Sequence, residues 1–275
     1  MGAIIDVKSL VSKFQNEIMA IVNEKKNKGE IVSIGILQVG KDGGSNFYRN
    51  SVVKLSNKLG IEPKEFLLEE NVSEEEIISV VNEINNDNNI TGVLMLLPMP
   101  KGIDSDKVKE ALSPSKDIDG VTTHNIGQFY SGNKAFIPCT PLSVMEILRS
   151  VTDLEGKEAV VIGRSNVVGK PLAQLLLNAN CTVTTVHSRT KNIEEVCRRA
   201  DILVSAIGKP KYINSNFIKD GAVVIDVGTS DVEGKITGDV DLEDVIEKVS
   251  YITKVPGGVG SLTTTILLKN LCEGL

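Results

Sequence analysis

Runs of apolar residues alternate with amphipathic segments along most of this chain. In the first half, the runs at 31–39, 65–68 and 91–97 predict buried strands. The segments at 45–60 and 73–86 predict helices, the second with a serine cap and an acidic first turn. Apolar strands separated by helices of this length predict parallel pairing, with helices on both faces of a sheet.

The second half repeats this scheme. Strands are predicted at 159–162, 182–186, 202–207 and 222–227, with helices at 169–178 and 193–200, which is the pattern of a doubly wound nucleotide-binding domain. A domain boundary is predicted near Phe136–Pro141, where Thr140 stands between two prolines and is placed to cap a helix over Leu142–Ser150. The last twenty or so residues predict an apolar helix that packs back on the first domain.

Composition narrows the class of protein. The chain has 275 residues with 41% hydrophobic, 24% charged and a net charge of −6, so it offers no basic footprint for a nucleic acid. We expect no membrane span and no signal peptide, and therefore a cytoplasmic protein. Four widely spaced cysteines and only two histidines predict buried reduced thiols and no metal site.

A glycine turn follows the strand at 159–162. Gly163 would let the backbone approach a phosphate, and the helix that begins at Gly169 would favour negative charge at its N-terminus. The spacing departs from G-x-G-x-x-G, because Ser165 replaces the second glycine and the last glycine falls one residue late. On this segment alone, a nucleotide site and a plain strand-to-helix turn are both open.

The end of the next strand, at 186–190, bears on the choice of nucleotide. NAD-binding folds place a carboxylate there for the ribose hydroxyls, and this segment has none. Arg164, His187, Ser188 and Arg189 instead offer donors suited to a ribose 2′-phosphate, which favours NADP over NAD. The alternative is that these polar residues only solvate the strand end.

Five motifs become specific when taken together and in order: Lys116–Gly120, Pro138–Pro141, Gly163–Pro171, His187–Thr190 and Val255–Gly260. This set resembles the bifunctional methylenetetrahydrofolate dehydrogenase/methenyltetrahydrofolate cyclohydrolase family over essentially the whole chain. The resemblance implies an α/β protein of two αβα domains with a cleft between them, the second Rossmann-like. Residues 1–137 and 255–275 would form the folate-binding catalytic domain, and residues 138–254 the NADP-binding domain. A homodimer is implied as well.

The resemblance also implies roles for single residues. Tyr48 would stack on the tetrahydrofolate derivative, since it has an aromatic face. Asp119 would hydrogen-bond the ring of that ligand, since its carboxylate is a bidentate acceptor. Residues lining the substrate site would be Leu97, Pro98, Pro256, Gly257 and Gly258. Residues contacting the cofactor would be Gly163, Arg164, Ser165, Ser188 and Thr229.

Two positions depart from the family pattern. The pattern after the tyrosine is Tyr-x-x-x-Lys, and the fourth residue here is Val52; the strand motif carries Gln where this chain has Leu96. In the family these two polar groups serve the cyclohydrolase step, and general acid-base help contributes about 10²–10⁴-fold. Lys54 lies roughly 120° round the helix from Tyr48 and is a poor substitute.

We therefore predict an NADP-dependent 5,10-methylenetetrahydrofolate dehydrogenase that gives methenyltetrahydrofolate, with the cyclohydrolase activity lost or weak. Hydride transfer needs chiefly proximity and alignment, which Tyr48, Asp119 and the nucleotide loops supply. Three alternatives stay open: a fully bifunctional enzyme, an NADP oxidoreductase for another substrate, and a non-catalytic nucleotide-binding or assembly protein.

Overall fold

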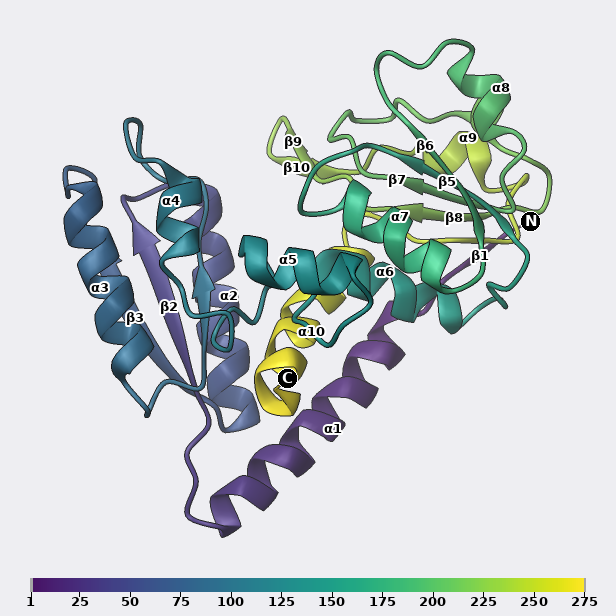
Figure 1. Ribbon diagram of the computed structural model, residues 1–275. Coiled ribbons are helices and arrows are strands. Elements are labelled where there is room, and N and C mark those ends of the chain that lie inside the picture. The colour runs from purple at the N-terminus through teal and green to yellow at the C-terminus, as the bar shows by residue number, and fades with distance from the viewer. Residues whose placement is uncertain (1, 275) are drawn as a thin grey trace. The chain divides into compact units, whose positions relative to one another are not determined.

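The computed structural model describes residues 2–274, which divide into two compact units (Figure 1). The first unit comprises residues 13–137 and 264–274, and the second comprises residues 2–12 and 138–263. Both divisions near the ends of the chain fall inside helices, namely α1 (Val7–Asn27) and α10 (Val259–Glu273).

A three-stranded parallel sheet forms the centre of the first unit, in the order β3-β2-β4. Its strands are β2 (Ser33–Val39), β3 (Glu62–Leu68) and β4 (Gly92–Met95). Every residue of β2 and β4 is buried, as the apolar runs predict for central and covered strands. The strand β3 begins three residues earlier than we predicted and lies at the sheet edge, where Pro63 is tolerated.

Helices cover both faces of this sheet. On one face, α3 (Glu74–Asn86) and α4 (Ser105–Glu110) pack Ile77, Val81 and Val108 against Leu37 of β2. On the other face, α2 (Gly43–Leu59) meets Gln38 of β2 through hydrogen bonds. The remaining helix wholly within this unit is α5 (Thr123–Tyr130).

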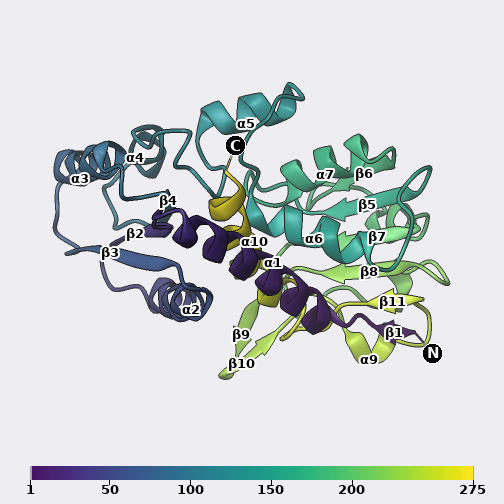
Figure 2. The same ribbon diagram turned by 90° about the horizontal axis from the view of Figure 1, so that it is seen from below.

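Six parallel strands form the sheet of the second unit, and Figure 2 shows their labels in the spatial order β1-β11-β8-β7-β5-β6. Their bounds are β1 (Ala3–Ile4), β5 (Glu158–Ile162), β6 (Thr182–Val186), β7 (Ile202–Ser205), β8 (Val223–Asp226) and β11 (Tyr251–Ile252). A separate antiparallel pair joins β9 (Ser230–Val232) to β10 (Lys235–Thr237). The doubly wound α/β prediction for this half is confirmed by the parallel pairing and the helices between strands.

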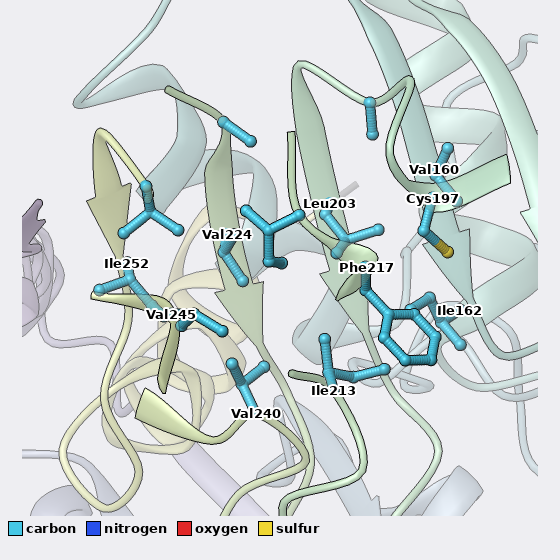
Figure 3. Close-up of a cluster of buried hydrophobic side chains, with 14 of the residues drawn as sticks. Val160, Ile162, Cys197, Leu203, Ile213, Phe217, Val224, Val240, Val245 and Ile252 are labelled. Carbon is cyan, nitrogen blue, oxygen red and sulfur yellow. The ribbon is translucent and has the colours of Figure 1, made fainter. Parts of the chain in front are cut away.

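One cluster of buried hydrophobic side chains in the second unit lies on one face of its sheet (Figure 3). Val160, Leu203 and Val224 project from neighbouring strands onto Phe217 and Val245. These come from the 3₁₀ helix η1 (Ser215–Phe217) and from α9 (Leu242–Val245), and α8 (Ile193–Cys197) adds Cys197. Two further helices, α6 (Cys139–Arg149) and α7 (Gly169–Asn178), pack on each other, and α7 packs on β5 and β6.

Three local predictions need correction. We expected residues 1–12 in the first domain, but β1 adds to the edge of the second unit's sheet by pairing with β11. We expected Thr140 to cap a helix from Leu142; the helix α6 begins at Cys139 after Pro138, because Pro141 is compatible with a first turn. The helix α2 begins before Ser45, and its N-cap is Asp42.

Candidate functional site

The glycine turn after β5 is a site of close backbone approach. Gly163 is buried with φ +123°, and a Cβ there would lie 2.5 Å from the carbonyl oxygen of Ala206. A Cβ on Gly169, the first residue of α7, would collide with the carbonyl oxygen of Gly163. The late glycine of the motif therefore lets α7 pack tightly on the strand end, which is the task of the last glycine in dinucleotide folds.

The residues between the two glycines shape the start of α7. The Ser165 hydroxyl accepts hydrogen bonds from the backbone N–H of Val168 at 3.2 Å and of Gly169 at 3.4 Å. Ser165 therefore holds the loop that leads into α7, and Arg164, Ser165 and Asn166 are all exposed on that loop. We place Ser165 first as a loop-shaping residue, with cofactor contact remaining a prediction.

The turn after β6 presents donors at the same edge of the sheet. The His187 N–H donates to Thr190 Oγ1 at 2.9 Å, and His187 Nδ1 accepts from the Arg189 N–H at 3.2 Å. The Nδ1 atom of the imidazole is therefore occupied within the turn, while Ser188 and Arg189 are exposed.

Strand register then brings the two groups of donors together. Ile162 of β5 pairs with Val186 of β6, so Arg164 and the pair Ser188–Arg189 follow directly from adjacent strand ends. No carboxylate occurs at 186–190. This donor set fits a 2′-phosphorylated ribose, because a phosphate takes hydroxyl and bidentate guanidinium donors.

Thr229 lies at the same carboxyl edge, beyond β8. It is exposed and follows Gly228, whose N–H donates to the Asp226 carboxylate at 2.9 Å. The second unit therefore gathers every predicted cofactor residue at one edge of one sheet, where α/β folds bind nucleotides.

In the first unit, the start of α2 is fastened to the loop after β4. The Asp42 carboxylate accepts from the Ser45 N–H at 2.8 Å, and the Ser45 hydroxyl donates to the carbonyl oxygen of Leu97 at 3.1 Å. The Leu97–Pro98 peptide bond is cis. These bonds fasten the first turn of α2, the helix that carries Tyr48, to the loop that holds the predicted substrate residues Leu97 and Pro98.

A polar network that we did not predict supports the same turn. Gln38 is only 2% exposed; its Oε1 accepts from Arg49 at 3.1 Å and its Nε2 donates to Asn46 at 2.9 Å. Arg49 also lies 3.2 Å from Glu65 of β3. Since Arg49 adjoins Tyr48 in sequence, this network restrains the helix that presents the half-buried tyrosine.

The two departures from the family pattern are both buried. Val52 is 0% exposed on the stripe of α2 that also buries Ser45 and Ser56, and Leu96, directly after β4, is 4% exposed. Lys54 is exposed on another side of α2, as its helical position predicts. Neither Val52 nor Leu96 can accept or donate a proton.

The Asp117–Gly120 turn separates the roles of two aspartates. Asp117 is 0% exposed and accepts from the N–H groups of Val121 at 3.0 Å and Thr122 at 2.9 Å, so its carboxylate holds the turn. Asp119 is half-buried. The chain at Asp117 runs parallel beside β4 at Val93, which takes Asp119 toward the carboxyl end of that strand.

The motif at 255–260 lies in the second unit, not in the first as we predicted. The peptide bond between Val255 and Pro256 is cis, Gly257 has φ +98°, and a Cβ on Gly258 would collide with the carbonyl of Lys254. Because this segment continues from β11, it belongs to the second unit, whereas we assigned 255–275 to the first domain. Substrate contact by Pro256, Gly257 and Gly258 stays a prediction.

The described chain offers no metal cluster and no membrane span. Within residues 2–274, no group of three or more His, Cys, Asp or Glu side chains is arranged to hold a metal ion. Over that range, no helix has the length and apolar character needed to cross a membrane. All four cysteines are buried free thiols, and burial raises the pKa of Cys197 to about 12.

Comparison with known proteins adds family-level findings. Residues 5–119 match the model of the tetrahydrofolate dehydrogenase/cyclohydrolase catalytic domain, and residues 138–275 match that of the NAD(P)-binding domain of the same family. The bifunctional protein FolD of Clostridium novyi is 51% identical over 277 residues, covering 100% of both chains.

Two solved structures are also similar over nearly the full length. The bifunctional FolD methylenetetrahydrofolate dehydrogenase/cyclohydrolase of Campylobacter jejuni has a TM-score of 0.97 and 39% identity, covering 99% of this chain and 98% of its own. The Trypanosoma brucei methylenetetrahydrofolate dehydrogenase-cyclohydrolase, complexed with NADP and an inhibitor, has a TM-score of 0.92 and 34% identity. That match covers 98% of this chain and 96% of the other.

Proposed function

Because the chain belongs to the tetrahydrofolate dehydrogenase/cyclohydrolase family, we propose that it is an NADP-dependent 5,10-methylenetetrahydrofolate dehydrogenase. The reaction moves a hydride from the methylene carbon to the nicotinamide of NADP⁺, giving methenyltetrahydrofolate and NADPH. The observation that carries the proposal is the pair of adjacent strand ends at β5 and β6, where Gly163, Arg164 and Arg189 follow the strands and no carboxylate occurs at 186–190.

The residues of the second unit would hold the cofactor in three places. Backbone groups around Gly163 and the α7 N-terminus suit the pyrophosphate, and Arg164 with Ser188 and Arg189 suits the 2′-phosphate. The nicotinamide, when bound, accepts the hydride. The protein's part is to hold its ring at a fixed distance from the folate carbon, because hydride transfer depends on proximity and orientation.

The first unit would supply the folate contacts. Tyr48 offers an aromatic face at a turn restrained by the Ser45–Leu97 and Gln38–Arg49 hydrogen bonds. Asp119 offers a carboxylate for adjacent ring donors, and Asp117 holds the turn in which Asp119 lies. These assignments extend the family membership to particular side chains.

For the cyclohydrolase activity, the names of the relatives and two buried residues of this chain favour different conclusions. The relatives' names favour a bifunctional enzyme over a lost cyclohydrolase, since proteins about 50% identical along the full chain are named bifunctional. A specific observation nevertheless supports the narrower candidate, a dehydrogenase with weak cyclohydrolase activity. Val52 and Leu96 are buried and apolar, so neither can move the protons of hydrolysis.

A product assay tests both candidates at once. The purified protein is incubated with methylenetetrahydrofolate and NADP⁺, and methenyl- and 10-formyltetrahydrofolate are separated over time, with an enzyme-free reaction to measure spontaneous hydrolysis. The Campylobacter jejuni enzyme serves as the bifunctional control. Formation of 10-formyltetrahydrofolate at a rate comparable to that of the control enzyme supports the bifunctional enzyme. Accumulation of methenyltetrahydrofolate, with hydrolysis at or close to the enzyme-free rate, supports the narrower candidate.

The same assay, with ligand binding measured beside it, tests for a different substrate and for a protein without catalysis. Binding of NADP without binding of the folate would indicate another substrate, and intact binding of both ligands without turnover would indicate a non-catalytic protein. We further propose a homodimer, which light scattering would test, and a reducing compartment such as the cytoplasm. The four buried free thiols support the reducing compartment.

A further inference from the structure

Two buried carboxylates stand at the carboxyl edge of the second unit's sheet and have no role in the function described above. Asp226 is the last residue of β8 and is 3% exposed; Asp239 follows β10 and is 0% exposed. A buried charge is costly unless hydrogen bonds compensate it, so what these groups bind indicates what they do.

Asp239 binds the loop that follows β7. Its Oδ2 accepts from the Ser205 hydroxyl and from the Ile207 N–H, both at 2.8 Å, and its Oδ1 accepts from the Lys209 N–H at 2.7 Å. Three donors within five residues converge on one carboxylate. The backbone from 205 to 209 is therefore held in one conformation by a residue 30 positions away or more.

That loop in turn lies against the predicted phosphate turn. The carbonyl of Ala206 occupies the space that a side chain at Gly163 would need, with 2.5 Å between the carbonyl oxygen and an added Cβ. Ala206 thus packs directly against the glycine turn. Asp239 is connected to the cofactor edge through Ile207 and Ala206, without having to touch a ligand.

Asp226 fixes Asp239 itself. The Asp226 carboxylate accepts from the N–H groups of Gly228 at 2.9 Å, Asp239 at 3.0 Å and Val240 at 2.9 Å. A Cβ on Gly228 would collide with Asp239 Oδ1, so the two carboxylates and this glycine are tightly packed. The pair joins the ends of β7 and β8 to the segment after β10.

The order of the strands tells which part of the cofactor this loop serves. β5 lies between β7 and β6, and the 2′-phosphate donors are at the ends of β5 and β6. A dinucleotide lying across this edge with its pyrophosphate at Gly163 extends its other half past β7. The loop 206–209 is therefore on the nicotinamide side of the glycine turn.

We propose that Asp239 is a positioning residue for the nicotinamide half of the cofactor, acting by holding the loop 206–209 through Ile207 and Lys209. The proposal rests on the proposed NADP function. It predicts that loss of the carboxylate weakens binding of whole NADP but leaves the adenosine half unaffected. A purely structural role for Asp239 would instead alter stability and leave the ratio of the two affinities unchanged.

The test is Asp239→Asn in the full chain, compared with wild type. The amide keeps the size but presents an NH₂ group toward one backbone donor, so at least one of the three bonds is lost. Dissociation constants for NADP and for adenosine 2′,5′-bisphosphate are measured calorimetrically, below the onset of thermal unfolding of every variant. Asp201→Asn is the matched control, because Asp201 accepts from the Glu158 N–H at 3.0 Å, at the opposite end of β5.

We expect about tenfold weaker binding of NADP to Asp239→Asn, equivalent to about 1.4 kcal/mol, and an unchanged constant for adenosine 2′,5′-bisphosphate. Asp201→Asn should change neither. Equal losses for both ligands, or unaltered NADP binding by Asp239→Asn, would overturn the proposal. If Asp239→Asn does not fold, Ser205→Ala removes one donor and should give a smaller loss confined to NADP; no such loss overturns the proposal. Wild-type protein that binds no NADP would refute the proposed function instead.

Discussion

Substitution of Gly163 by alanine tests the close approach on which the cofactor edge depends. Two costs add. A residue with a side chain is strained at φ +123°, by about 1–3 kcal/mol. The new Cβ also lies 2.5 Å from the Ala206 carbonyl oxygen, so backbone must move, at a further cost of about 1–3 kcal/mol. We expect the free energy of unfolding to fall by about 2–6 kcal/mol in total.

The control for this substitution is Gly221→Ala. Gly221 has φ +78° in the same unit, but an added Cβ there meets no atom within 4 Å. Its cost is therefore the backbone strain alone, about 1–2 kcal/mol. Because each kcal/mol lowers the melting temperature of a domain of this size by about 2–4 °C, Gly163→Ala should melt several degrees below Gly221→Ala.

Thermal unfolding and NADP titration together measure the two effects. Gly163→Ala should bind NADP at least tenfold more weakly than wild type, because the loop carrying Ala206 is displaced, and Gly221→Ala should bind it normally. Equal melting temperatures for the two variants would mean that the Ala206 carbonyl moves away from the new Cβ without loss of stability. Normal NADP binding by Gly163→Ala would refute the link between this approach and the cofactor site.

Three further predictions concern the folate side, the nucleotide preference and pH. Val52→Lys combined with Leu96→Gln should raise the rate of methenyltetrahydrofolate hydrolysis above wild type in the product assay; a folded double variant without gain would show that more than two side chains differ. Arg189→Ala should raise the KM for NADP about tenfold or more and leave the KM for NAD unchanged, since a charge-assisted hydrogen bond contributes about 1.5–3 kcal/mol. Equal effects on both KM values would show that Arg189 does not bind the 2′-phosphate. Burial raises the pKa of Asp226 to about 6, so the folded protein holds a proton that the unfolded chain releases near pH 4. Its contribution to stability is full below about pH 4 and is lost as pH rises through 6. Urea unfolding should then show wild type gaining stability relative to Asp226→Asn as pH falls from 7 to 4.5. If the free energies of unfolding of the two proteins change in parallel with pH, the pKa of Asp226 is not raised.

Much of the fold could be predicted wherever a segment carries its own signal. The helix α7 begins and ends at the residues we predicted, Gly169 and Asn178, with Pro171 in its first turn. The helix α3 has the predicted Ser73 cap, completed by Glu76 as a capping box. Local hydrogen bonds and apolar periodicity determine such elements, so the sequence suffices for them.

Elements fixed by distant partners could not be predicted. The strands β1 and β11 are two residues long, too short for a pattern, and exist because Ala3 and Ile4 pair with Tyr251 and Ile252. Our prediction for the start of α6 was wrong, because the residues near Thr140 and Pro138 do not by themselves decide which of the two precedes the first turn.

The candidate site divides in the same way. Gly163, Arg164 and Arg189 could be named because a motif and its spacing identify them. Gln38 and Asp239 could not, since their partners lie on other elements and only burial reveals their importance. A polar residue within or directly after an apolar strand run, as at Gln38 and Asp226, is the signal that would have flagged such groups.

The pairing of β1 with β11 bears on the order in which the protein can assemble during synthesis. Ala3 precedes its partner Tyr251 by 248 residues along the chain. At roughly 5–20 residues per second, the first strand waits about 10–50 s for that partner. The first unit likewise receives residues 264–274 only from the last helix. The second sheet therefore cannot be completed before Tyr251 and Ile252 have been synthesised, nor the first unit before residues 264–274 have been.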